Sequence, residues 1–111
     1  MMRRPANKYL TPAMERVLCR MRDEELELDH VPGEAFWYLD SDRVHPMTAK
    51  RLVQLVLISG TFTHGRGAVN RFTINEDGRG VLDSADYVPR IVIAMGNSYA
   101  LLVRTAGSQE R

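Results

Sequence analysis

Residues 37–58 read WYLDSDRVHPMTAKRLVQLVLI, an aromatic run that passes through a turn into a long apolar repeat. Pro46 is suited to the first position of a helix, because its ring fixes a helical φ and its missing N–H leaves no hydrogen bond unmade. The apolar residues that follow recur at helical spacing and predict an inward face. That face consists of Ala49, Leu52, Val53 and Val56. Ser59 and Gly60 end the pattern, so we predict a helix from residue 46 to about residue 58.

Two elements are predicted before this stretch. Thr11 can cap a helix through its hydroxyl and Pro12 can open it, so we expect a helix over residues 12–23. Its apolar stripe consists of Met14, Val17, Leu18 and Met21. Residues 26–30 alternate apolar and acidic side chains, which is the period of a half-buried strand. They predict a β-hairpin with the aromatic run at residues 35–39.

A second hairpin and a short helix are predicted after residue 60. Residues 61–63 and 71–74 are β-prone and bracket a glycine-rich basic loop at residues 64–70. Asn75 can then cap a short helix that runs to Leu82.

The C-terminal part is apolar without alternation. Residues 90–95 and 99–103 flank the turn-forming Gly96-Asn97-Ser98, so we predict a β-hairpin over residues 89–105. One face of such a hairpin can cover the core, while the other is exposed on a monomer and marks an interface. Burial of the whole hairpin within its own domain is the alternative reading.

The chain of 111 residues, 44% of them hydrophobic, is the size of one domain with one core. We expect a flexible arm over residues 1–10, the domain over residues 11–88, the hairpin, and a disordered tail over residues 106–111. No apolar run approaches the roughly 20 residues that span a bilayer. Cys19 is the only cysteine, which suits a reducing compartment, so we expect a cytoplasmic protein with no membrane partner.

The order of these elements resembles the winged helix-turn-helix group, and most of all the small winged-helix-like proteins of phages and prophages. The resemblance covers about residues 11–83 and rests on residues 37–40, 43–48, 57–58 and 71–79. It implies an α+β, winged helix-turn-helix-like domain to which the C-terminal hairpin is added.

In that group the helix at Pro46 is the recognition helix and the loop at residues 65–67 is the wing. The chain departs from the group at Met47 and Leu55, where basic or polar residues are common, and at Val56, where a glycine often ends the helix.

Double-stranded DNA is the first partner to consider, for a small transcriptional regulator. Arginine and glutamine side chains can bond base edges, and lysine mainly contacts phosphate. The candidate DNA-binding residues are Arg3, Arg4, Thr48, Lys50, Arg51, Gln54 and Arg66. The formal net charge is only +1, so attraction to DNA has to come from a local patch. Ordinary solvated charges on a surface helix are the alternative.

A protein partner is the second hypothesis, either a host protein modulated by a phage-encoded chain or a second copy in a homodimer. The second helix or the C-terminal hairpin would form the contact. The candidate interface residues are Met47, Leu55, Ile91, Ile93, Met95, Tyr99, Leu101 and Val103.

Catalysis is not expected. The acidic residues between Asp23 and Asp29 include types used in acid–base chemistry, but neighbouring strand residues point to opposite faces and do not converge. The three histidines stand far apart without a cysteine partner, so no zinc spacing exists. We therefore expect a binding protein that is not an enzyme and uses no metal and no cofactor.

Overall fold

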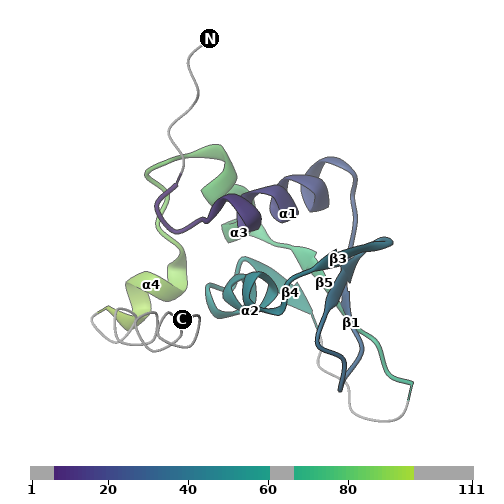
Figure 1. The fold of residues 1–111 in the computed structure, drawn as a ribbon. Coiled ribbons are helices and arrows are strands. Elements are labelled where there is room, and N and C mark those ends of the chain that lie inside the picture. Colours follow the sequence, from purple (N-terminus) through teal and green to yellow (C-terminus); the bar gives the residue numbers. More distant parts are fainter. Residues whose placement is uncertain (1–6, 61–66, 97–111) are drawn as a thin grey trace.

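The computed structural model describes residues 7–60 and 67–96, which form an α+β fold (Figure 1). The described helices are α1 (Pro12–Asp23), α2 (Pro46–Gln54), α3 (Glu76–Asp83) and α4 (Arg90–Met95). The described strands are β1 (Leu28–His30), β2 (Trp37–Leu39), β3 (Asp42–Val44), β4 (Ile58–Gly60) and β5 (Asn70–Ile74).

The strands form one antiparallel sheet in the order β3-β2-β1-β5-β4. The central strand places Leu28 opposite Leu39 on one side and Phe72 on the other. The predicted pairing of residues 26–30 with residues 35–39 is therefore confirmed. β3 was not predicted, and it forms because Asp40 takes a left-handed φ of 57° and reverses the chain within two residues.

One face of the sheet is buried under the helices and the other is solvated. The buried face carries Leu28, Trp37, Leu39, Val44, Ile58 and Phe72, while Asp29, Tyr38, Arg43, Ser59, Arg71 and Thr73 alternate with them on the other face. In Figure 1, α1, α2 and α3 gather on one side of the strands, and α1 contacts both α2 and α3. The core is thus a single layer between three helices and one sheet face.

Helix α1 follows its prediction closely. The Thr11 hydroxyl accepts a hydrogen bond from the Met14 N–H at 3.2 Å, and the helix spans Pro12–Asp23. The predicted stripe is buried throughout. Helix α3 likewise begins at its predicted cap, since Asn75 Oδ1 accepts from the Gly78 N–H at 3.0 Å.

Helix α2 starts at Pro46 as predicted but ends at Gln54, so its predicted extension to residue 58 is wrong. Val56 has a φ of 53°, in the left-handed region that stops a helix. The N–H groups of Val56 and Leu57 then bond the carbonyls of Val53 and Leu52, both at 3.0 Å, in a Schellman motif. Ile58 therefore enters strand β4, and the predicted strand at residues 61–63 lies outside the described residues.

The first half of the predicted C-terminal hairpin is also wrong, because Arg90–Met95 form helix α4. A short run that is apolar on both faces fits a strand and a helix equally well by periodicity. A strand needs a partner for its backbone groups, whereas a helix satisfies them internally. Here the Pro89 carbonyl accepts from Val92 at 3.0 Å and from Ile93 at 3.3 Å, which starts the helix.

Residues 7–10 are packed on the domain, although the sequence placed them in a flexible arm. The Asn7 side chain is buried, and its amide donates to the carbonyls of Ser84 and Tyr87, both at 2.9 Å. A single asparagine thus joins the start of the domain to the connection between α3 and α4.

Candidate nucleic-acid interface

Helix α2 packs by one face and presents the other. Ala49, Leu52 and Leu55 at its C-cap are buried against the core. Lys50 is exposed and Arg51 and Gln54 are half-buried on the remaining surface, and the helix contains no acidic residue. Three of the four DNA contacts predicted on this helix, Lys50, Arg51 and Gln54, therefore share one positively charged surface.

Two side chains of this segment have the opposite exposure to the one predicted. Leu55, a predicted interface residue, is only 4% exposed and belongs to the core, so that prediction is wrong. Val56, predicted to face inward, is 41% exposed. Val56 lies beyond the end of α2 and has a left-handed φ, so its side chain leaves the inward face on which the prediction placed it. Met47 stays half-buried at the surface.

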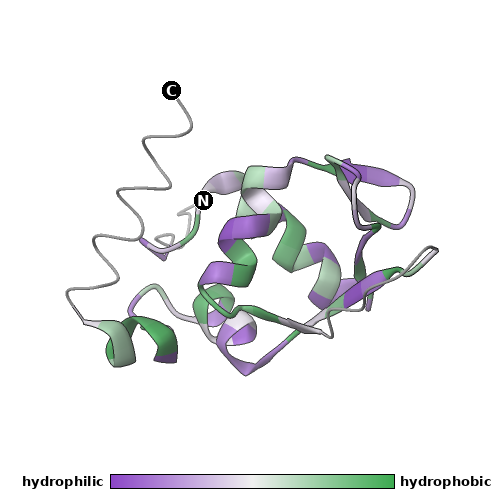
Figure 2. Cartoon of the chain, turned by 90° about the horizontal axis from the view of Figure 1, so that it is seen from below, coloured by the Kyte–Doolittle hydropathy of each residue, from purple (hydrophilic) through white to green (hydrophobic). Residues whose placement is uncertain are grey.

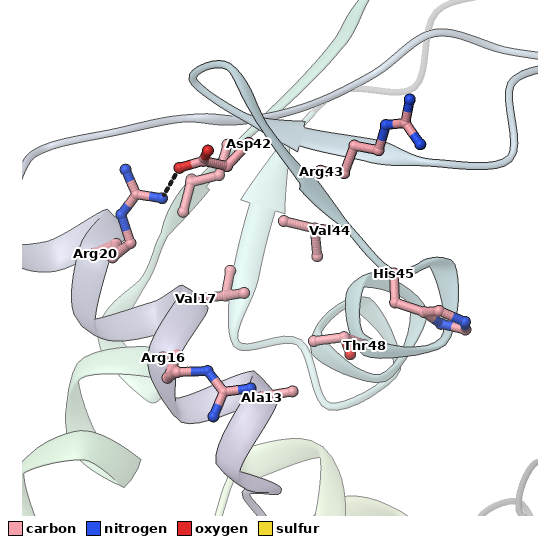
Figure 3. Close-up of a pocket in the computed structure, with 10 residues that line it drawn as sticks. Ala13, Arg16, Val17, Arg20, Asp42, Arg43, Val44, His45 and Thr48 are labelled. Carbon is pink, nitrogen blue, oxygen red and sulfur yellow. Dashed lines mark hydrogen bonds and ion pairs between the residues drawn. The ribbon is translucent and has the colours of Figure 1, made fainter.

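The start of α2 borders a pocket. His45 precedes the helix, and its Nδ1 accepts a hydrogen bond from the Met47 N–H at 3.1 Å. The pocket lies between α1, the β2–β3 hairpin and the first turn of α2, and has a volume of about 390 Å³ (Figure 3). Its lining residues are Ala13, Arg16, Val17, Arg20, Leu39, Asp42, Arg43, Val44, His45 and Thr48.

The side chains in Figure 3 divide the pocket into an apolar floor and a polar rim. Val17 and Val44 point into it from α1 and β3. Thr48 points from α2 toward α1, where Arg16 lies across from it. Arg43 turns to the other side of its strand, with its guanidinium 5.2 Å from the centre of the Phe36 ring. The polar groups that face one another here are therefore Arg16 and Thr48.

The arginines of α1 differ in whether their charge is balanced. Arg20 bonds Glu24 at 2.9 Å and Asp42 at 2.6 Å, and these hydrogen bonds raise the pKa of its guanidinium. Arg22 bonds Asp23 at 2.9 Å and Asp83 at 3.3 Å. Arg16 is exposed, and among residues 7–60 and 67–96 it has no acidic or hydrogen-bonding partner. Its positive charge is thus available to a ligand.

Arg16 was not among the predicted contacts, although the sequence holds a signal for it. Positions three and four residues away on a helix are neighbours. Around Arg16 these positions are Pro12, Ala13, Cys19 and Arg20, none of them acidic. Arg20, in contrast, has Glu24 four residues later. The pocket that Arg16 borders could not be found this way, because it depends on how α1, α2 and β3 pack.

Helix α4 is anchored by polar contacts at its start and is apolar beyond it. Asp77 of α3 is 4% exposed and accepts from the Tyr87 hydroxyl at 2.5 Å and from Arg90 Nε at 3.1 Å. Burial by itself raises the pKa of the Asp77 carboxyl, but the hydrogen bonds from Tyr87 and Arg90 outweigh it and hold this pKa below its ordinary value. The same bond to Asp77 raises the pKa of Tyr87.

The predicted interface residues of this segment are therefore on a helix. Ile91 packs against the core, Met95 is half-buried, and Ile93 is 69% exposed. Figure 2 shows α4 as an apolar helix at the edge of the molecule. The remaining predicted site residues lie outside the described residues: Arg3, Arg4, Arg66, Tyr99, Leu101 and Val103.

No protein-family model matches the chain, and neither do curated proteins or solved structures. In the part of the chain that the structure describes, no helix is both long and apolar enough to cross a membrane. The same residues contain no cluster of three or more histidine, cysteine, aspartate or glutamate side chains placed to hold a metal ion.

Proposed function

We propose that the chain is a small winged-helix DNA-binding protein, a transcriptional regulator of the phage or prophage type. Helix α2 is its recognition helix, and the connection between β4 and β5 is its wing. The observation that carries the proposal is the surface of α2, where Lys50, Arg51 and Gln54 lie together and no acidic side chain occurs in the helix.

The order of elements supports this assignment. A helix, three antiparallel strands, a second helix, a two-stranded hairpin and two further helices follow one another, and both α2 and the β4–β5 pair contribute to the same hydrophobic core. A helix held by its buried face can enter a major groove with its other face, where arginine and glutamine side chains reach base edges.

Fluorescence anisotropy on a mixed-sequence duplex at low and moderate salt tests the proposal. We expect a Kd of about micromolar or tighter at low salt, weakening steeply as salt rises, because binding releases counterions from the phosphates. Lys50→Ala and Arg51→Ala weaken binding further, whereas Arg79→Ala, an exposed arginine on α3, serves as the control for loss of one positive charge. Absence of binding by the wild-type chain at low salt overturns the proposal.

A homodimer through α4 is the second candidate, and exposed Ile93 is the observation that favours it. A second copy of the chain is the partner we propose, because a two-fold axis would present two α2 helices to paired half-sites. Light scattering should then give about twice the monomer mass, and Ile93→Asp should return the monomer. A monomeric wild-type chain excludes the homodimer and redirects attention to a host protein at the same surface.

A further inference from the structure

The pocket between α1, β3 and α2 adds a contact that the recognition helix alone does not supply. We propose that this pocket seats a phosphodiester group of the DNA backbone, held by the Arg16 guanidinium and the Thr48 hydroxyl. The inference rests on the proposed DNA binding and extends it from the outer surface of α2 to the flank of the helix.

The pocket has the donors that a phosphate needs. Arg16 and Thr48 approach it from two different helices and lie across from one another (Figure 3). Neither side chain forms a hydrogen bond with another residue in the described ranges, so their donors are free for a ligand. A guanidinium and a hydroxyl both donate to phosphate oxygens, and the guanidinium also neutralises the charge.

The charge balance of the pocket is positive. Asp42 is its acidic lining residue, and its carboxylate is bonded to Arg20 at 2.6 Å. Arg20 is in turn shared with Glu24 at 2.9 Å. The lining carries three arginines, Arg16, Arg20 and Arg43, so its positive charge exceeds the negative charge of these two carboxylates, and Arg16 stands at the end of the pocket away from Asp42.

The floor of the pocket strengthens the contact. Val17, Leu39 and Val44 are buried and apolar, and they form the surface between the two polar ends. A charge pair formed against such a surface is screened less than one in open water. The volume of the pocket, about 390 Å³, is large enough to hold a phosphate group.

The position of the pocket fits backbone contact and not base contact. Thr48 lies on the flank of α2 that faces α1, whereas Lys50 lies on the exposed surface. A duplex that receives a helix in its major groove carries its phosphates along the flanks of that helix. Thr48, a predicted DNA contact, is therefore assigned to the backbone, and Arg16 is a new contact.

Salt-dependent binding separates this inference from the proposed function. Anisotropy is measured between about 50 and 200 mM salt for the wild type, Arg16→Ala, Thr48→Val and Arg79→Ala, on two duplexes of unrelated sequence. Loss of one phosphate contact lowers the salt slope by about one and weakens binding by about tenfold near 100 mM salt. We expect this for Arg16→Ala equally on both duplexes, a smaller loss for Thr48→Val, and an unchanged slope for Arg79→Ala.

The outcomes are distinct. If the wild type binds and Arg16→Ala leaves the slope and affinity unchanged, or changes them no more than Arg79→Ala, the phosphate site is wrong and the proposed function stands. If Arg16→Ala weakens binding to one duplex only, Arg16 reads sequence and the backbone assignment is wrong. If the wild type binds no DNA at all, both proposals fail. Thermal melting of each variant confirms that the fold is retained, which the exposure of Arg16 favours.

Discussion

Helices α2 and α3 are nine and eight residues long, and each begins after a capping side chain. They differ in how they pack against the rest of the domain. α2 contains no glycine and no acidic residue, and Lys50 is exposed on its surface. α3 carries three acidic residues, one of them the buried Asp77, and brings its backbone close to its neighbours through Gly78 and Gly80. Both helices therefore pack on the core, but α2 packs by its buried side chains and keeps an exposed polar face, whereas α3 packs by its backbone.

The largest expected effect is at the buried face of α2. Leu52 is fully buried, and Leu52→Ala should lower the free energy of unfolding by roughly 2–5 kcal/mol through lost burial and a cavity. Lys50→Ala, two residues earlier and exposed, should change it by no more than about 0.5 kcal/mol. Urea denaturation measures both. Equal effects would show that α2 does not have one packed and one free face.

Gly78 tests the close packing of the α3 backbone against its neighbours. A β-carbon at this position would overlap the Leu57 carbonyl oxygen and approach Ile74 Cγ1 to 2.7 Å. Gly78→Ala should therefore destabilise the protein by about 1–3 kcal/mol. Helix propensity alone predicts the reverse sign, a gain of about 1 kcal/mol. Urea denaturation decides between the two, with Arg79→Ala as the neighbouring exposed control, and a stabilised Gly78→Ala would remove close packing as the reason for this glycine.

The buried Asp77 of α3 makes the stability of the protein depend on pH. Its folded-state pKa is depressed, so its contribution is fully present above the unfolded value near 3.9 and is lost as pH falls through the folded value. Asp77→Asn should cost about 1–2 kcal/mol at pH 7, because Tyr87 and Arg90 lose a charged acceptor. The gap between wild type and variant should begin to narrow below about pH 4 and should close as pH falls through the lower folded value. Urea midpoints across this range check it, with exposed Asp86→Asn as the control that should show no such gap.

The smallest effect concerns the end of α2. Val56 holds a φ of 53°, which is unfavourable for a β-branched residue, and its side chain is 41% exposed. Val56→Gly relieves this strain, about 1–2 kcal/mol, but adds freedom to the unfolded chain, so a net gain of about 0.5–1 kcal/mol is expected. Thermal melting should show a higher Tm. A lower Tm would mean that the valine side chain contributes packing that outweighs the strain.

The candidate site was partly predictable. Lys50, Arg51 and Gln54 were found because an amphipathic pattern separates the outward residues of a helix from its buried ones. Arg16 was not predicted, although the sequence shows that no acidic residue lies three or four positions away from it. Arg16 became a candidate contact only because the packing of α1 against α2 places it across a pocket from Thr48.

The sequence by itself determined where α1, α2 and α3 begin and that β1 pairs with β2. Thr11, Asn75 and Pro46 act on backbone groups within a few residues, and the alternation around Leu28 selects a face without reference to distant residues. Such signals are local, so they can be read in the chain.

Only the tertiary structure decided where α2 ends and that residues 90–95 form a helix. It also decided that Leu55 is buried and Val56 is exposed. It also turned Gly78, unfavourable in an isolated helix, into the point where α3 approaches Leu57. The close approach of Gly78 to Leu57 and the bonds from Tyr87 and Arg90 to Asp77 join residues from different elements. Such contacts depend on the packing of the whole domain, so the pattern of neighbouring residues does not predict them.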